Sequence, residues 1–163
     1  MKIFGIVGWK NSGKTGLMER LVTEFTRRGT TVSTIKHAHH DFDVDQPGKD
    51  SFRHRKAGAR EVVLASAHRF AVMHELRGAP EPGLGEFLTQ MSPVDLVLIE
   101  GYKTERHPKI EAHRAATGKD LLAPQDTNVL AVATDSLITV DCPVFDLDDT
   151  LGIADFIAAQ VGL

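Results

Sequence analysis

The most constraining feature of this sequence is the segment GWKNSGKT, which runs from Gly8 to Thr15. The segment matches the pattern G-x-x-x-x-G-K-[ST] at every fixed position. It follows an apolar run, residues 2–7, that is typical of a buried strand. After it, Leu17, Leu21 and Phe25 recur every four residues, as on a helix. A strand, a glycine-rich turn and a helix in this order predict a loop whose backbone N–H groups bind phosphate.

Two side chains of this loop and one distant acid are expected to carry the chemistry. Lys14 would reach the β- and γ-phosphates of a nucleoside triphosphate, and the Thr15 hydroxyl would bind Mg²⁺. Glu100 ends a second apolar strand that starts at Asp95, and such an acid commonly holds the magnesium ion or its waters. We therefore expect Lys14, Thr15 and Glu100 as catalytic residues, with Thr15 and Glu100 at the metal. The alternatives are a surface turn acid for Glu100 and a solvated residue for Asp95.

The order of the predicted elements favours an α/β fold with a mostly parallel sheet and helices on both faces, as in P-loop NTPases. Further strands are expected at residues 31–36, 95–99, 109–112, 129–133 and 144–145. Helices are expected at residues 15–28, 51–57 and 84–91, and after Thr150, which can cap the last helix. Strand patterns at residues 61–65 and 69–76 predict an additional β-hairpin. The length fits one domain over residues 1–163, a single P-loop nucleotide-binding domain.

Composition excludes several other classes of protein. A net charge of −3 gives no excess positive field for broad nucleic-acid binding. One cysteine, Cys142, cannot form an internal disulfide, which suits a reducing compartment. The sequence has no apolar run of membrane-spanning length and no signal-peptide pattern, so we expect no membrane partner and a cytoplasmic location.

A histidine group follows the second predicted strand. His37, His39 and His40 precede four acids, which are Asp41, Asp43, Asp45 and Asp50. Imidazole suits Zn²⁺ or Ni²⁺, but no cysteine and no helical i, i+4 spacing accompany the histidines. A polar loop that faces a ligand is therefore favoured over a metal site.

Guanine recognition and a second phosphate contact are both left open by the sequence. The Asn-Lys-x-Asp loop of common GTPases is absent, and three acids that follow strands are possible substitutes: Asp135, Asp146 and Asp148. Arg53, Lys56 and Arg60 fall at helical spacing and form either a cationic face or a solvated helix surface.

Beyond the loop, an ordered series of motifs resembles the molybdopterin-guanine dinucleotide biosynthesis protein B (MobB) family over essentially the whole chain. The motifs are GWKNSGKT, IKHAHHDFDVDQPGKDSFRHRKAGA (35–59), VLIEGYK (97–103), PKIEAHR (108–114), AVATD (131–135) and VFDLDDTLGIADFI (144–157). Tyr102 stands where many relatives carry phenylalanine, a departure that keeps the ring.

The resemblance implies a GTP-binding adaptor with Mg²⁺ that assists molybdopterin guanylyltransferase, protein A of the same pathway, in attaching GMP to molybdopterin. It also implies a homodimer, for which the predicted hairpin is one pairing element, and at most slow GTP hydrolysis. Weak turnover agrees with the sequence, which offers no glutamine at a switch position and no assignable arginine finger. The chain is not expected to be the nucleotidyltransferase itself.

The motif and the resemblance together give the expected nucleotide-binding residues: Gly8, Trp9, Lys10, Asn11, Ser12, Gly13, Lys14, Thr15, Gly16, His37, His39, His40, Asp45, Lys49, Asp50, Gly101, Lys103 and Asp135.

Two other hypotheses remain open from the sequence. A small-molecule kinase would use Arg106 and Arg114 as a lid and one of the acids at 41–50 as a base. A GTP-dependent metal-insertion factor would use the histidine group. Transfer of phosphate to a metabolite would favour the kinase, and stoichiometric zinc or nickel would favour the insertion factor.

Overall fold

The structure is a computed structural model that describes residues 1–38 and 43–163. The chain forms two compact units. We call Met1–His37 together with Met91–Leu163 the core unit, and Ala38–Gln90 the hairpin unit. Each is described by itself.

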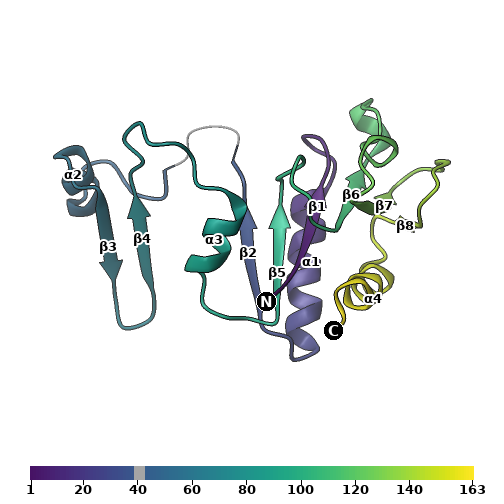
Figure 1. Cartoon of the computed structure of the whole chain (residues 1–163), viewed down its shortest axis with the longest axis horizontal. Coiled ribbons are helices and arrows are strands. Elements are labelled where there is room, and N and C mark those ends of the chain that lie inside the picture. The colour runs from purple at the N-terminus through teal and green to yellow at the C-terminus, as the bar shows by residue number, and fades with distance from the viewer. Residues whose placement is uncertain (39–42) are drawn as a thin grey trace. The chain divides into compact units, whose positions relative to one another are not determined.

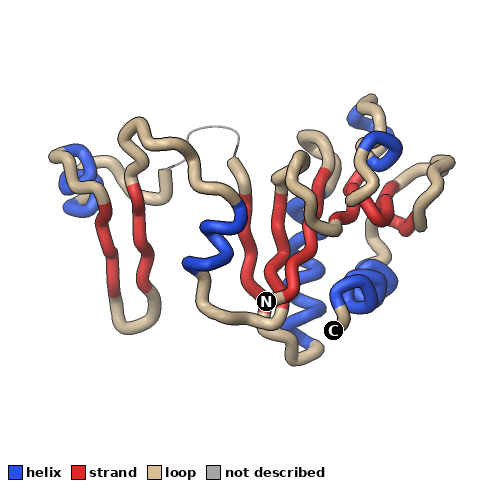
Figure 2. The backbone as a smooth tube through the Cα atoms, viewed as in Figure 1, coloured by secondary structure: helices blue, strands red, loops and turns tan. Residues whose placement is uncertain are grey.

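The core unit is built on a six-stranded sheet in the order β2-β5-β1-β6-β7-β8 (Figure 1). The strands are β1 (Lys2–Val7), β2 (Val32–Lys36), β5 (Leu96–Glu100), β6 (Lys109–His113), β7 (Val129–Thr134) and β8 (Val144–Asp146). Every neighbouring pair is parallel. Figure 2 shows these strands side by side in red. The predicted α/β fold with a parallel sheet is confirmed.

Two helices, α1 (Lys14–Arg27) and α4 (Thr150–Val161), pack on one face of this sheet. Phe4 and Ile6 of β1 point into the core that also holds Leu17 of α1 and Ile153 of α4. All four side chains are fully buried. The alternation of a strand puts Lys109 and Glu111 of β6 on the opposite face, where they contact the irregular segment 102–128. The sequence predicted helices on both faces of the sheet. In the core unit as described, this irregular segment is what contacts Lys109 and Glu111 on the second face.

The first turn of α4 corrects one sequence prediction. Asp149 is the N-cap residue, and its Oδ1 accepts a hydrogen bond of 2.9 Å from the backbone N–H of Gly152. Thr150, the expected cap, is the first helical residue, and its Oγ1 accepts a hydrogen bond of 3.0 Å from Arg20 Nε. The Asp149 carboxylate binds the Gly152 N–H, which has no partner within the helix. The Thr150 hydroxyl is therefore not needed as a cap, and it links α4 to Arg20 of α1.

The hairpin unit contains α2 (Asp50–Lys56), β3 (Glu61–Ala65), β4 (Phe70–His74) and α3 (Leu84–Gln90). Strands β3 and β4 pair antiparallel, so the predicted hairpin is confirmed. It exposes four large apolar side chains: Val63, Leu64, Phe70 and Val72.

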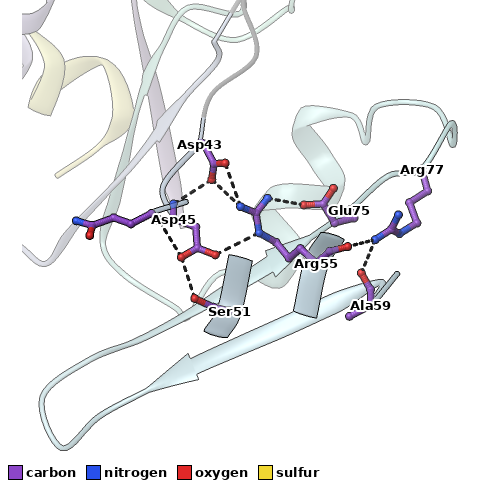
Figure 3. Close-up of polar contacts among 8 residues, drawn as sticks. Asp43, Asp45, Ser51, Arg55, Ala59, Glu75 and Arg77 are labelled. Atoms are coloured by element: carbon purple, nitrogen blue, oxygen red, sulfur yellow. Dashed lines mark hydrogen bonds and ion pairs between the residues drawn. The ribbon is translucent and has the colours of Figure 1, made fainter. Parts of the chain in front are cut away.

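One arginine organises the loop and helix of the hairpin unit (Figure 3). The guanidinium of Arg55 forms ion pairs with Asp43 at 2.8 Å, Asp45 at 3.4 Å and Glu75 at 2.8 Å. Asp45 also accepts a hydrogen bond of 2.8 Å from the Ser51 hydroxyl. Three carboxylates around one largely buried guanidinium tie the last turn of α2 to the loop before that helix and to the residue that follows β4. Within residues 1–38 and 43–163, no helix combines the length and apolar character needed to cross a lipid bilayer.

Candidate functional site

The loop from Gly8 to Thr15 joins the carboxyl end of β1 to the first turn of α1. Gly8 and Gly13 have φ angles of 144° and 94°, in the region that favours glycine. A Cβ atom at Gly8 would collide with the carbonyl oxygen of Ala112, and one at Gly13 would lie 2.9 Å from Leu147 Cδ2. Only glycine fits these positions, and the loop therefore keeps the close backbone turn that directs N–H groups at an anion.

Lys14 lies across this loop. Its Nζ donates a hydrogen bond of 2.6 Å to the carbonyl oxygen of Trp9. The pKa of Lys14 is lowered, mainly because burial removes water from the ammonium; Glu100 opposes this effect, and Lys103 and Lys36 add to it. Lys103 and Lys36 thus each lie close enough to Lys14 to repel its ammonium group. A polyanion between them would relieve that repulsion, which is the electrostatic fit expected of a phosphate site.

Glu100 is placed as the sequence predicted, at the end of β5 next to β1, where it pairs in register with Ile6. Its side chain is only 12% exposed, and its Oε1 lies 3.4 Å from Lys36 Nζ. Thr15 is exposed in the first turn of α1. A hydroxyl and a carboxylate are hard oxygen ligands of the kind that Mg²⁺ prefers, so the residues present fit this ion. Asp95, at the other end of β5, accepts hydrogen bonds from the Thr31 N–H and hydroxyl, and they lower its pKa.

Lys36 is a site residue that the sequence analysis missed. It is the last residue of β2, the edge strand that pairs with β5. It lies opposite Glu100 in the strand register, and its ammonium forms an ion pair with the Glu100 carboxylate. Its position depends on the strand order, in which β2 lies beside β5, and no local motif indicates it.

Trp9 forms one wall of the loop. Its indole Nε1 donates a hydrogen bond of 2.8 Å to the carbonyl oxygen of Asp120, and Lys103 Nζ lies 4.1 Å from the ring centroid. The preceding residue, Tyr102, has a positive φ of 51° and stacks on His37 with ring centroids 4.6 Å apart. The structure therefore brings Trp9, His37 and Lys103, which were all predicted as site residues, to the carboxyl edge of the sheet.

Lys109 fixes the segment that carries Lys103. It is fully buried, and its Nζ donates to the carbonyl oxygens of Lys103 at 2.8 Å and Glu105 at 2.6 Å and to Asp126 Oδ2 at 2.9 Å. Burial opposes ionisation of Asp126, but hydrogen bonds from Lys109 and Asn128 outweigh it and lower the pKa of Asp126 to about 2. All three ammonium donors are thus satisfied, and the charge is paired.

Arg114 and Asp135 lie on the other side of the loop, after β6 and β7. A Cβ atom at Gly13 would lie 3.1 Å from Arg114 Nε. Asp135 Oδ1 accepts a hydrogen bond of 3.0 Å from the Ala115 N–H. The other two acids proposed as guanine contacts are engaged locally, since Asp146 accepts from the Asp148 N–H and Asp148 pairs with Arg20 at 3.3 Å.

The remaining predicted residues are not joined to this site by the described structure. Asp45, Lys49 and Asp50 belong to the hairpin unit, where Asp45 is held by Arg55 and Ser51. His39 and His40 lie outside the described residues. Among residues 1–38 and 43–163, no group of three or more His, Cys, Asp or Glu side chains is arranged to hold a metal.

Comparison with known proteins identifies relatives of this chain. The family model described as molybdopterin guanine dinucleotide synthesis protein B, MobB, matches residues 3–135. The molybdopterin-guanine dinucleotide biosynthesis adapter protein of Haemophilus influenzae is 43% identical over 159 residues, which cover 95% of this chain and 86% of that protein. The Escherichia coli protein of the same name is 39% identical over 160 residues, covering 95% and 90%.

Solved structures show the same fold. A MobB protein homolog from Bacillus stearothermophilus gives a TM-score of 0.75 at 29% identity and covers 99% of both chains. Bacillus subtilis MobB gives a TM-score of 0.76 at 24% identity, covering 99% of this chain and 98% of that one.

Proposed function

Since this chain belongs to the molybdopterin guanine dinucleotide synthesis protein B family, we propose that it is a GTP-binding accessory protein in the conversion of molybdopterin to molybdopterin guanine dinucleotide. The observation that supports this function is the loop at residues 8–15, in which Lys14 lies near Glu100, Lys36 and Lys103. Relatives that cover 95% of the chain carry the name of adapter proteins in this pathway.

The loop amides and Lys14 would hold the triphosphate, and Thr15 and Glu100 would hold Mg²⁺. When bound, the ion would neutralise negative charge on the β- and γ-phosphate oxygens. Lys36 and Lys103 would add positive charge at the phosphate end, and the wall formed by Trp9 would limit access of water. Asp135 keeps one carboxylate oxygen beyond its bond to Ala115 for the guanine base.

As an accessory protein, the chain would hold GTP without efficient hydrolysis and present it, or molybdopterin, to molybdopterin guanylyltransferase. The hairpin is the proposed contact between two copies in a homodimer. Its exposed Val63, Leu64, Phe70 and Val72 form an apolar surface on two short strands. A two-stranded hairpin alone is marginally stable, and pairing with a second hairpin would bury this surface.

Direct titration with nucleotide tests the proposal. Trp9 is the only tryptophan of the chain and lies in the loop, so its fluorescence reports on this site alone. We expect Mg²⁺–GTP to change the Trp9 emission, to bind more tightly than Mg²⁺–ATP in calorimetry, and to lose binding in Lys14→Ala. Lys119→Ala, which removes an exposed charge from the segment 102–128, is the matched control. Preference for ATP, or nucleotide binding by Lys14→Ala equal to that of the wild type, would overturn the assignment.

The kinase alternative would assign Arg114, beside Gly13, to a different role. A kinase needs such a cation near the transferring phosphate. Transfer of the γ-phosphate to a metabolite hydroxyl, rather than slow release to water, would establish that function in place of the adaptor.

A further inference from the structure

The side chain of Arg114 lies against the phosphate-binding loop at Gly13. A Cβ atom at Gly13 would lie 3.1 Å from Arg114 Nε and 3.6 Å from Nη2, so the guanidinium covers the α-carbon just before Lys14. Arg114 is exposed, and none of the described residues accepts a hydrogen bond from its guanidinium. Its five donors are therefore available to a ligand.

The backbone around Arg114 is fixed on both sides. Before it, Ala112 and His113 of β6 pair with Ala133 and Thr134 of β7. After it, the Ala115 N–H donates to Asp135 Oδ1 at 3.0 Å, and the Thr117 N–H donates to the Arg114 carbonyl at 3.0 Å. A guanidinium that starts from a fixed backbone loses less freedom when it binds, which favours a contact with a ligand.

The strand order gives a bound nucleotide a direction. Glu100 lies at the end of β5, on one side of β1, whereas Arg114 follows β6, on the other side. Because Mg²⁺ bridges the β- and γ-phosphates, an acid that holds the ion places the γ-phosphate on the β5 side. The α-phosphate and the nucleoside then extend over β6 and β7, where Arg114 and Asp135 lie.

The charges on the two sides agree with this direction. Lys36 and Lys103 lie near Lys14 on the β5 side, as the triphosphate end requires. On the β7 side, the carboxylate of Asp135 would repel a phosphate but can accept from a base N–H. In the strand order, Arg114 after β6 comes between Lys36 at the end of β2 and Asp135 after β7, as a contact to the α-phosphate requires.

We propose that Arg114 binds the α-phosphate of the guanine nucleotide, an inference that rests on the proposed nucleotide binding. A guanidinium matches two phosphate oxygens with two parallel N–H donors, and such a contact acts on GDP and GTP alike. It differs from an arginine that stabilises the transferring γ-phosphate, because that residue would act on GTP alone.

Calorimetric titrations of the full chain with Mg²⁺–GTP, Mg²⁺–GDP and Mg²⁺–ATP test the inference. Arg114→Ala is expected to weaken GTP and GDP equally, by about tenfold each, and to leave the GTP-to-ATP preference unchanged. Arg114→Lys keeps the positive charge but lacks the two parallel N–H donors of a guanidinium, so it should recover part of the lost affinity. Lys119→Ala is expected to leave all three affinities at wild-type values. Since the Arg114 side chain is exposed, the thermal unfolding curves of its variants should overlay the wild type.

Other outcomes would overturn the inference in different ways. A loss confined to GTP would assign Arg114 to the γ-phosphate, and a change in the GTP-to-ATP preference would assign it to the base. Unchanged affinities in Arg114→Ala, with a wild type that binds GTP, would remove this contact and leave the proposed function standing. A wild type that binds no nucleotide would remove both.

Discussion

The ammonium of Lys103 lies over the indole of Trp9, with Nζ 4.1 Å from the ring centroid. The two residues are far apart in the chain, and they meet because the segment after β5 turns back over the loop after β1. The contact places a cation at the proposed phosphate site and beside the only tryptophan of the sequence. The loop therefore contains its own fluorescent reporter.

We predict that Lys103→Met shifts the Trp9 emission and weakens GTP binding. A cation–π contact at a partly exposed site contributes about 0.5–1 kcal/mol, and the lost charge acts on the phosphates as well, so the affinity should fall about fivefold. Emission spectra and calorimetry measure the two effects. Lys119→Met serves as the control, and a Lys103→Met protein with wild-type emission and affinity would contradict the prediction.

Glu100→Gln should reduce the dependence of GTP binding on magnesium. The variant removes the negative charge proposed to hold the ion but keeps the shape of the side chain and its place at the end of β5. Titrations with GTP in the presence of Mg²⁺ and of a chelator should show a large difference for the wild type and a small one for the variant. Asp95→Asn, at the opposite end of β5, should keep the wild-type difference. Equal magnesium dependence in Glu100→Gln and the wild type would exclude Glu100 from the metal.

Lys109→Met is predicted to destabilise the core unit. The change leaves the partly buried Asp126 carboxylate and two carbonyl oxygens without the shared donor that the fully buried Lys109 provides. Breaking a buried ion pair from one side costs about 3–5 kcal/mol, which urea unfolding can measure as a shift in the midpoint. The double variant Lys109→Met/Asp126→Asn should recover part of the loss, because it removes the unpaired charge. A double variant less stable than the single one would show that the pairing is not the cause.

His107 should make the fold sensitive to mild acid. The side chain is 3% exposed, and burial together with Lys109 lowers its pKa to about 4, from an ordinary value of 6.5. The unfolded chain therefore takes up the proton first, so the free energy of unfolding falls as the pH drops from 6.5 towards 4, with a slope of up to about 1.4 kcal/mol per pH unit. Urea unfolding across this range measures the slope. In His107→Gln the slope should flatten, and an unchanged slope would assign the acid sensitivity to other groups.

The sequence predicted the parts of the structure that depend on local pattern. The loop at Gly8 to Thr15, the parallel strands and the hairpin are all set by short-range signals, and the structure contains each of them. The position of Glu100 followed from the end of an apolar run. The predicted ends of strands and helices differ from the observed ones by one or two residues at several places. Capping decides where a helix begins, as Asp149 does for α4, and pairing with the neighbouring strand decides where a strand ends.

The parts that the sequence did not predict depend on strand order. Lys36 reaches Glu100 because β2 lies next to β5, and Arg114 reaches Gly13 because β6 lies next to β1. Lys109 has the pattern of a strand residue, and nothing near it in the sequence indicates that its ammonium binds the carbonyl of Lys103. Such contacts become visible only when the order of the strands in the folded chain is known. The roles of the nucleotide-binding residues stay predictions until ligand is titrated.

The apolar side chains on the hairpin have a consequence for experiments at low concentration. If β3 and β4 complete their packing only against a second copy, the melting temperature of the chain rises with protein concentration, as mass action requires. Dilution would then loosen the hairpin while the six-stranded sheet stays folded. The two units would lose their structure at different temperatures, and a single melting curve would hide that difference.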